Sequence, residues 1–342
     1  MHPKVAIIYN QPGSSRYTTI GEEKAVLGVL DEVAAVHKAL DGLGYPVTLV
    51  PLLPPLKQAR AKLKTLEADL VFNLFEGFDG APETEALVAD ILSEQGAPYT
   101  GCPGTALALC LDKAKTKALL KASGIGTPSY QVLTPETLSL FQLGYPCIVK
   151  PCAEDASHGL SEDGVANDFA SVAKQVTLVS TFFGGKALVE EFVAGRELNA
   201  TVLGNRELTV MPISEIEYSL PPPMPRVLTF AAKWEPESIY FQGTKSVCPA
   251  QIIEEDMREH IIGTARAVFR LVGCRGYARV DMRLDTEGQL HVLEVNPNPD
   301  ISPDSGAARQ AEAAGMRYEQ FIEQIVLFAL EGENETKNPP YG

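Results

Sequence analysis

A pair of short segments carries residues whose types and spacing could do chemistry. Asp281 follows Arg279 by two residues, Asn296 follows Glu294 by two, and both runs alternate polar with apolar side chains. Residues 285–288 between them have the composition of a turn, so the pattern predicts a β-hairpin. Asp281, Glu294 and Asn296 can then share one face beside Arg279. Two carboxylates and a carboxamide oxygen are hard ligands that suit Mg²⁺, and such a site usually serves a phosphate.

The alternative for paired acidic residues is a solvated hairpin face. Glu294 lies between Leu293 and Val295 in an otherwise apolar strand. That strand enters residues 296–300, a proline-containing loop that cannot continue a β-ladder. Polar ligands at a strand end, next to a stiff loop, favour a binding site.

The length, composition and net charge of the chain limit which classes of function are possible. A chain of 342 residues, with 45% hydrophobic and 21% charged residues, has room for two or three domains, each with its own core. The formal net charge of -15 argues against nucleic acid as a partner, because binding it requires clustered positive charge. A bound nucleotide would therefore need specific lysines and metal ions to neutralise its phosphates.

The six cysteines show no CxxC pair, which predicts reduced, mostly buried thiols in a cytoplasmic protein rather than disulfides or a zinc site. No apolar run approaches the length of a membrane span, and the N-terminus lacks the layout of a signal peptide. The polar tail at residues 333–342 is expected to be disordered.

The first hundred residues alternate in the βαβ manner. Strands are expected at residues 5–9, 47–50 and 69–74, with a helix over residues 22–43. Such alternation predicts a parallel, doubly wound sheet whose ligands bind beyond the carboxyl ends of the strands. The loop at residues 75–80 would lie at such an end, within reach of a substrate.

The middle of the chain predicts a second unit. A helix is expected over residues 105–123, and residues 126–128 break it and lead to a strand at 145–151. That strand ends near Lys150, just before a small, polar loop at residues 153–160 that is expected to be mobile. A lysine in this position could hold a phosphate, and the alternative is a plain turn.

Acidic residues flank a predicted hinge between two sheets. Glu190 and Glu191 close a strand at residues 187–193, and Glu197 begins the next strand. They could accept hydrogen bonds from an adenine amine and ribose hydroxyls, or be surface charges. The proline-rich segment at residues 219–245 has no steady period, which predicts a long loop acting as a lid.

In this order and spacing, the segments resemble the ATP-grasp superfamily, and most closely the D-alanine-D-alanine ligase family, over residues 5–330. The resemblance rests on the strand, lysine and loop around Lys150, on residues 190–192 with Glu197, and on residues 273–281 with residues 294–296. It implies an α/β and α+β ATP-grasp fold with an N-terminal doubly wound parallel-sheet domain, a central lid-like α+β domain and a C-terminal α+β domain. These domains are expected at residues 1–104, 105–186 and 187–332.

The resemblance also implies ATP as the cosubstrate. Lys113 and Lys150 would contact its α and β phosphates, Lys233 in the lid would reach the γ-phosphate, and Ser157 in the loop after Lys150 would be a further contact. Adenine would be held by Glu190 and by the backbone near Glu191 and Val193, and the ribose by Glu197. The metal ligands would be Asp281, Glu294 and Asn296, binding two Mg²⁺ ions, with Mn²⁺ as a substitute.

The chemistry that the resemblance implies is ligation of a carboxylate to an amine through an acyl phosphate. Arg279 would stabilise the tetrahedral oxyanion, with a backbone N–H near Asp300 as a second donor. Ser305 and Gly306 match the family positions that hold the carboxylate of the second substrate. The partners would be small amino-acid-like molecules, and a homodimer is among the expectations because the family is often dimeric.

The chain departs from the family around the first substrate. Residues 11–16 replace a Ser/Glu-containing segment, residues 75–80 replace a His-Gly loop, and Ala156 and Trp234 cannot complete the family's hydrogen-bond chain. These changes predict a ligase for an amino acid other than D-alanine in the first position. A true D-alanine-D-alanine ligase, phosphoryl transfer to a hydroxyl, ligation to a thiol, and an ATP-binding regulatory protein without turnover are the alternatives.

Overall fold

A computed structural model describes residues 2–13, 23–153, 160–251 and 253–337. The N-terminal part contains a sheet of three parallel strands in the order β2-β1-β3, as the βαβ pattern predicted. The strands are β1 (Val5–Asn10), β2 (Val47–Leu52) and β3 (Leu70–Leu74).

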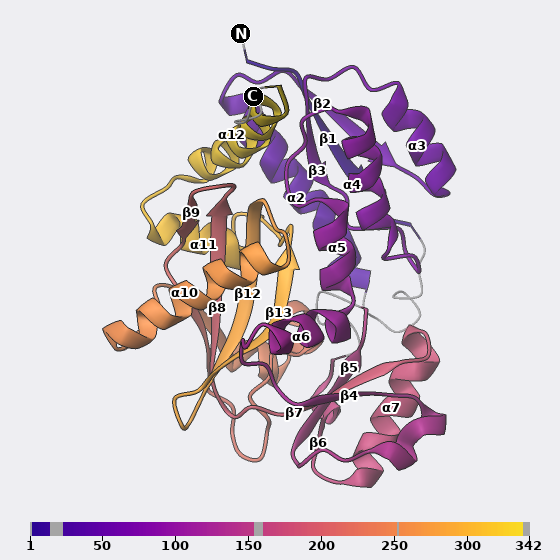
Figure 1. Cartoon of the computed structure of the whole chain (residues 1–342), viewed down its shortest axis with the longest axis vertical. Helices are drawn as coiled ribbons and strands as arrows, with labels where there is room; N and C mark the ends of the chain where they lie inside the picture. Colours follow the sequence, from indigo (N-terminus) through magenta and orange to yellow (C-terminus); the bar gives the residue numbers. More distant parts are fainter. Residues whose placement is uncertain (1, 14–22, 154–159, 252, 338–342) are drawn as a thin grey trace.

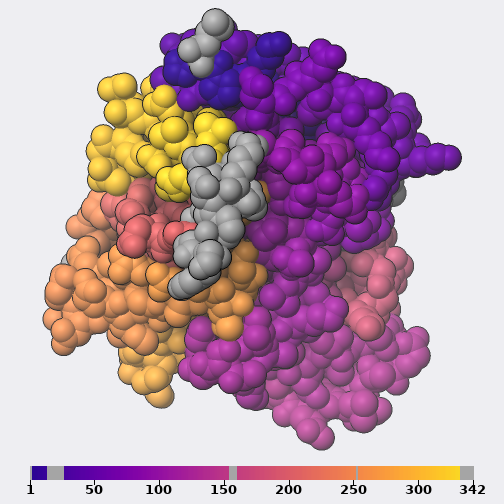
Figure 2. All heavy atoms as spheres, turned by 45° about the horizontal axis from the view of Figure 1, so that its top comes forward, coloured from indigo at the N-terminus to yellow at the C-terminus, as the bar shows by residue number. Residues whose placement is uncertain are grey.

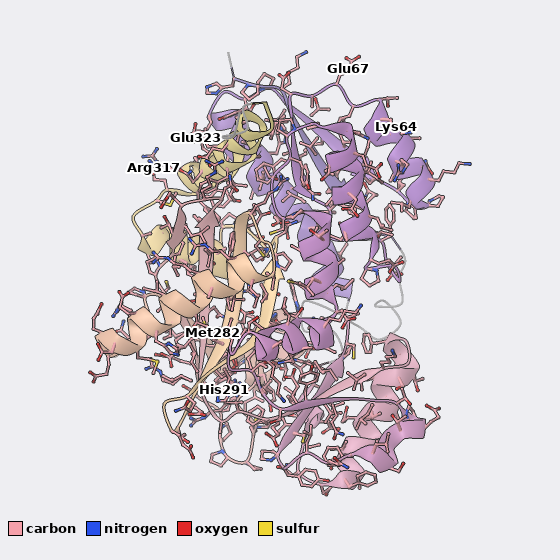
Figure 3. All side chains as sticks on the ribbon, in the orientation of Figure 1. Lys64, Glu67, Met282, His291, Arg317 and Glu323 are labelled. Carbon is pink, nitrogen blue, oxygen red and sulfur yellow. The ribbon has the colours of Figure 1, made fainter. Side chains whose placement is uncertain are left out.

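Helices cover both faces of this sheet, so every residue of β1 is buried. On one face Ile7 packs with α2 (Glu23–Gly42) and α12 (Tyr318–Lys337), and on the other Ile8 packs with α3 (Leu56–Lys64) and α4 (Thr84–Gln95). Figure 1 shows this doubly wound arrangement. In Figure 3, Lys64 at the end of α3 and Glu323 on α12 lie on opposite sides of the sheet.

The helix expected at residues 105–123 is in fact two helices, α5 (Gly104–Leu111) and α6 (Lys113–Ala122). The break falls at Asp112, whose side chain accepts a hydrogen bond of 3.0 Å from the Lys115 backbone N–H and so caps α6. An aspartate that bonds the backbone in this way competes with the interior of a helix, and this is why the single long helix was a wrong prediction.

The central part is a four-stranded sheet, in the order β4-β7-β5-β6, packed on α7 (Phe169–Phe183). Its strands are β4 (Tyr130–Leu133), β5 (Cys147–Pro151), β6 (Val165–Ala166) and β7 (Ala187–Glu191). Two 3-10 turns, η1 (Pro135–Leu140) and η2 (Glu162–Gly164), complete it. Because β7 pairs with β4 and β5, the central sheet includes residues 187–191, beyond the boundary predicted at residue 186.

The C-terminal part is a larger, antiparallel sheet in the order β11-β10-β8-β12-β13, with β9 added beside β8. Its strands are β8 (Gly195–Gly204), β9 (Leu208–Val210), β10 (Ser214–Tyr218), β11 (Thr244–Val247), β12 (Gly276–Asp285) and β13 (Leu290–Pro297). The helices α10 (Glu255–Leu271) and α11 (Gly306–Ala313) pack on it. The hairpin predicted from the sequence is therefore confirmed as β12 and β13.

The segment at residues 219–245, predicted as a long loop, contains the short helices α8 (Phe230–Trp234) and α9 (Ile239–Gln242). Each begins after a hydroxyl residue, Thr229 or Ser238, whose side chain accepts a hydrogen bond from a backbone N–H in the first turn. These caps stabilise helical turns that the surrounding prolines obscure in the sequence.

The N-terminal and C-terminal parts share their hydrophobic cores. One core joins α3 and α4 to β8, β12 and β13, and another joins β1 and α2 to α11 and α12. The central sheet and α7 have a separate core. In the space-filling view the segment coloured yellow near the C-terminus lies against the indigo segment near the N-terminus (Figure 2).

Three predictions about the whole chain can be compared with this fold. All six cysteines are free thiols, three of them buried. None of the described helices is long and apolar enough to cross a membrane. Helix α12 runs to Lys337, into the tail predicted to be disordered from residue 333, and residues 338–342 lie outside the described part.

Candidate functional site

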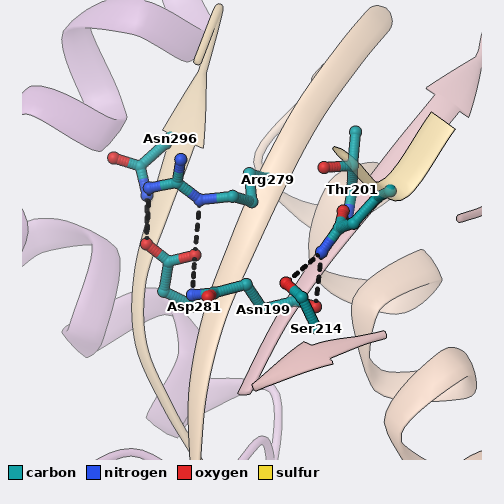
Figure 4. A network of polar contacts seen from close by, with 7 residues as sticks. Asn199, Thr201, Ser214, Arg279, Asp281 and Asn296 are labelled. Carbon is teal, nitrogen blue, oxygen red and sulfur yellow. Dashed lines mark hydrogen bonds and ion pairs between the residues drawn. The ribbon is translucent and has the colours of Figure 1, made fainter. Parts of the chain in front are cut away.

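The site is centred on one face of the hairpin. Asp281 lies directly opposite Glu294, and Arg279 lies opposite Asn296. Residues two apart on a strand point to the same side, so these four side chains form a single cluster. Arg279 donates to both oxygens of Asp281, from Nε to Oδ1 at 2.7 Å and from Nη2 to Oδ2 at 2.8 Å (Figure 4).

Two carboxamides complete the surroundings of Asp281, which is 7% exposed. Asn199 on β8 donates to Oδ1 at 2.7 Å, and Asn296 donates to Oδ2 at 2.9 Å. The carboxamide oxygen of Asn296 points away from Asp281 (Figure 4). Gln310 of α11 donates to the Asn199 carbonyl at 2.9 Å, so a neighbouring helix fixes the strand that carries Asn199. The aspartate is therefore rigidly oriented.

Glu294 is the more open of the two carboxylates, with its side chain 31% exposed. Lys113 of α6 places its Nζ 3.9 Å from Glu294 Oε2. Burial by itself would raise the pKa of Glu294. The positive charges that outweigh burial and lower this pKa to about 2 are those of Lys113, Lys150, Lys233 and Arg279. Three predicted phosphate-binding lysines thus converge on the predicted metal ligand.

This depressed pKa makes the stability of the fold depend on pH. The folded-state pKa of Glu294 lies below its ordinary value of 4.5, so its ion pairs stabilise the protein above about pH 4.5. We expect that contribution to be lost as the pH falls from about 4.5 towards 2. Urea unfolding across this range should show a shallower decline in unfolding free energy for Glu294→Gln than for the wild-type protein. The exposed Glu287→Gln in the hairpin turn is the matched control, and equal slopes in all three proteins would contradict the assignment.

A buried ion cluster lies between α6 and the central sheet. Glu190 at the end of β7 is 1% exposed and pairs with Lys117 at 2.9 Å and with Lys150 at 3.1 Å. Lys117 also donates to Thr127 Oγ1 at 2.9 Å. Burial alone would raise the pKa of Glu190, but the two lysines lower it; burial lowers the pKa of Lys117 despite Glu190. The carboxylate predicted to face adenine is thus held between two cations.

Glu197, near the start of β8, accepts hydrogen bonds from two neighbouring side chains, Tyr218 and Arg283. Its Oε2 accepts hydrogen bonds from the Tyr218 hydroxyl at 2.8 Å and from Arg283 Nη2 at 2.6 Å. Arg283 also donates to the Val193 carbonyl at 2.7 Å and stacks over the Phe192 ring, 4.8 Å from its centroid. Arg283 therefore fixes the whole segment that was predicted to hold adenine and ribose.

Lys233, on α8, lies in the field of the hairpin cluster. Its pKa is lowered by burial and by Arg279, whereas Glu294 and Asp281 act in the opposite direction. The neighbouring Trp234 lies against the N-terminal part of the chain, since a Cβ placed on Gly28 of α2 would be 3.4 Å from its ring. The segment predicted as a lid therefore contacts α2 through Trp234, and its Lys233 lies in the electrostatic field of the hairpin.

Ser305 and Gly306 lie at the start of α11, next to Arg279. The Ser305 hydroxyl accepts from the Ala308 backbone N–H at 3.2 Å and caps the helix. A Cβ on Gly306 would lie 4.0 Å from Arg279 Cδ and Nη1. The positive end of the helix thus faces the same space as the guanidinium group, which suits an anionic group of a substrate.

The structure thus brings most of the predicted residues together, with several partners that the sequence did not reveal. Ser157 and Ala156 lie outside the described residues, and the Glu191 side chain accepts a long hydrogen bond of 3.4 Å from the Gly144 N–H. Lys117, Asn199 and Arg283 contact predicted site residues but were not themselves predicted from the sequence to belong to the site. The sequence could have indicated Lys117, because this lysine follows Lys113 by about one helical turn and so lies on the same helix face. The other two meet their partners only through strand pairing.

Comparisons with known proteins show the family of the chain. Residues 119–327 match the family model described as "D-ala D-ala ligase C-terminus". The chain is 35% identical to the uncharacterized protein y4sG of Sinorhizobium fredii, over 83% of this chain and 79% of that protein. It is 31% identical to the D-alanine-D-alanine ligase of Haemophilus influenzae, over 86% of this chain and 94% of that protein.

Solved structures share the fold. The D-alanine-D-alanine ligase of Bacillus anthracis has a TM-score of 0.75 at 20% identity, covering 97% of this chain and 99% of that one. The VanG D-Ala:D-Ser ligase of Enterococcus faecalis has a TM-score of 0.73 at 20% identity, covering 96% of this chain and 100% of that one. Fold and site together define an ATP-grasp ligase, an enzyme that forms carbon-nitrogen bonds. Within that class, the chain belongs to the D-alanine-D-alanine ligase family.

Proposed function

We propose that this protein joins two amino-acid-like substrates by an amide bond, using ATP to activate the first carboxylate as an acyl phosphate. The observation that carries the proposal is the hairpin cluster, in which Asp281 and Glu294 face each other beside Arg279. The carboxylates supply metal ligands, and the convergent lysines supply the local positive charge that a triphosphate needs in an otherwise acidic chain.

The nucleotide is proposed to lie between the central and C-terminal sheets. Lys113 and Lys150 bind the α and β phosphates, with Ser157 as a further contact, and Glu190 holds Lys150 in position through their ion pair. The backbone at Glu191 and Val193 binds adenine, and Glu197 accepts from the ribose. This placement is supported by the positive charges of Lys113 and Lys150, which both lower the pKa of Glu294.

The donor set at the hairpin fits Mg²⁺. Asp281 and Glu294 are direct cross-strand neighbours, and the Asn296 oxygen is turned away from Asp281. A metal at Asp281 would take the place of hydrogen bonds that Arg279, Asn199 and Asn296 now donate to it. Asp281, Glu294 and Asn296 are proposed to hold two Mg²⁺ ions, with Mn²⁺ as a substitute. When bound, the metal supplies neutralisation of the phosphate charge.

The remaining groups divide the reaction between them. A carboxylate oxygen of the first substrate attacks the γ-phosphorus and ADP leaves, while Lys233 stabilises the charge on the phosphoryl group. The amine of the second substrate then attacks the acyl carbon, loses a proton, and phosphate leaves. Arg279 stabilises the oxyanion, with a backbone N–H near Asp300 as a second donor, and Ser305 and Gly306 at the start of α11 bind the second carboxylate.

The first substrate is proposed to be an amino acid other than D-alanine. Trp234 contacts α2, at a family position where a hydroxyl would complete a hydrogen-bond chain. The competing candidate is formation of D-alanyl-D-alanine, which is favoured because several relatives are D-alanine-D-alanine ligases. A cytoplasmic location is supported by the six free thiols, and a homodimer stays a prediction.

A substrate panel tests the function. Pairs of D- and L-amino acids are incubated with Mg-ATP, and phosphate release is compared with the masses of the products. We expect phosphate release to require two amino acids and to yield an amide, with a mixed pair used more efficiently than D-alanine alone. Efficient D-alanyl-D-alanine formation would sink the altered specificity, and a phosphorylated or thioester product would overturn amide ligation. Nucleotide binding without phosphate release would favour a regulatory protein.

A further inference from the structure

A chain of polar contacts joins strand β5, which carries a proposed phosphate-binding lysine, to strand β13 of the hairpin. Lys150 of β5 pairs with Glu190 at 3.1 Å, and Glu190 pairs with Lys117 at 2.9 Å. Lys117 donates to Thr127 Oγ1 at 2.9 Å, and this hydroxyl donates to the Val292 carbonyl of β13 at 2.8 Å. Lys117 lies in the middle of the chain, and the proposed reaction gives it no role.

The two lysines that share Glu190 differ in their freedom to leave it. The Lys150 side chain is 13% exposed, and its charge also acts on Glu294, where it lowers the pKa of the carboxyl group. The Lys117 side chain is 1% exposed and is held on its other side by the Thr127 hydroxyl. Lys150 can therefore turn towards a phosphate, whereas Lys117 stays where it is.

The Thr127 hydroxyl is in turn held in place by β13. The Gly126 carbonyl accepts from the Val292 N–H at 2.8 Å while Thr127 donates to the Val292 carbonyl, so both backbone groups of one strand residue are engaged. Glu294 follows Val292 by two residues. Lys117 is thus anchored to the strand of the proposed metal ligand rather than to the central sheet.

Moving Lys150 away from Glu190 has a cost that Lys117 offsets. Glu190 is 1% exposed, and a buried carboxylate without a cation beside it is strongly destabilising. If Lys150 were the sole partner of Glu190, a phosphate would have to compete with a buried carboxylate for the same ammonium group. With Lys117 in place, the carboxylate stays neutralised after Lys150 has turned away.

We propose that Lys117 is a positioning residue for the nucleotide, which keeps Glu190 neutralised so that Lys150 is free to bind a phosphate. The inference rests on the proposed function, in which Lys150 contacts the phosphates, and it adds a residue that touches neither the nucleotide nor the amino acids. The event is an exchange of ion-pair partners. The Lys150 ammonium moves from a Glu190 oxygen to a phosphate oxygen, and no proton is transferred.

Replacing Lys117 with methionine tests the proposal. The change removes the charge and keeps most of the length of the side chain, and Glu190 retains Lys150 as a partner, so the variant is expected to fold. We expect the KM for ATP to rise about tenfold, with kcat at saturating ATP and the KM for both amino acids unchanged. The loss then lies in nucleotide binding alone, a split that general damage to the fold would not produce.

The matched control is Lys121→Met, the same substitution about one helical turn further along α6. Lys121 is exposed, so its variant should keep the wild-type KM for ATP. Melting temperatures establish that both variants are folded. An unchanged KM for ATP in Lys117→Met, or an equal rise in Lys121→Met, would overturn the proposal.

A second substitution shows whether Lys117 acts through Glu190. In a Glu190→Gln background no carboxylate needs a cation, so adding Lys117→Met should leave the affinity for ATP equal to that of Glu190→Gln alone. A role for Lys117 that is independent of Glu190 predicts the same loss of affinity in both backgrounds. That result would reject the exchange of partners.

Direct binding separates this inference from the proposed function. Calorimetry with Mg²⁺ and a non-hydrolysable ATP analogue measures nucleotide affinity without turnover. If the wild-type protein forms no amide but binds the analogue, and Lys117→Met weakens that binding about tenfold, the ligase function fails and the role of Lys117 stands. If the wild-type protein forms an amide and Lys117→Met binds the analogue equally well, only the role of Lys117 fails. No binding of the analogue by the wild-type protein would reject both.

Discussion

Replacing Glu294 with glutamine is expected to lower the rate of ATP-dependent phosphate release about a thousandfold, which corresponds to about 4 kcal/mol of barrier height. The substitution keeps the shape of the side chain but removes one of the two carboxylates of the proposed metal site. It also leaves the positive charges of Lys113, Lys150, Lys233 and Arg279 less neutralised. The rate is measured under saturating Mg-ATP with the best substrate pair.

The control for this prediction is Glu287→Gln, in the exposed turn of the same hairpin, which should retain the wild-type rate. Circular dichroism and the melting temperature establish whether Glu294→Gln is folded, and the partial exposure of Glu294 makes a folded variant the expectation. Survival of phosphate release in a folded Glu294→Gln protein would mean that the metal assignment is wrong.

Replacing Glu190 with leucine is expected to lower the free energy of unfolding by about 3–5 kcal/mol. Glu190 is the shared ion-pair partner of Lys117 and Lys150. Because the Lys117 side chain is only 1% exposed, removing the Glu190 carboxylate leaves the buried positive charge of Lys117 without compensation. Urea unfolding, followed by a signal from secondary structure, measures the change.

A double substitution separates the charge from the packing. Removing Lys117 together with Glu190, as Lys117→Met/Glu190→Leu, should recover much of the lost stability, because no lone buried charge remains there. A loss below about 1 kcal/mol in the single variant, or a double variant less stable than it, would show that the ion cluster is not what stabilises this junction.

The hairpin was the part of the site most accessible from the sequence. Alternation of polar and apolar residues fixes which side chains share a face, and this is why Asp281 and Glu294 were expected together and are direct neighbours. The same local logic located β1, β2 and β3 and the loop after β3. Such features depend on residues close in the chain, where periodicity carries the information.

The partners of the site residues could not be located in that way. Asn199 reaches Asp281 across 82 residues of sequence, and Arg283 reaches Glu197 across 86. Both contacts depend on the pairing of β8 with β12, which spacing alone does not determine. The break at Asp112 was missed for a different reason, because a local capping bond overrode an otherwise continuous helical pattern.

The distribution of the hydrophobic cores bears on how the molecule opens. The N-terminal and C-terminal parts are tied into one cooperative unit by cores that both contribute to, whereas the central sheet and α7 form a small unit whose core is their own. Exchange of the central amides with solvent hydrogen can then proceed through local opening that leaves the larger unit intact. The hairpin belongs to the larger unit, so it is expected to keep its geometry when the central sheet opens, whereas Lys150 on β5 moves with the central sheet.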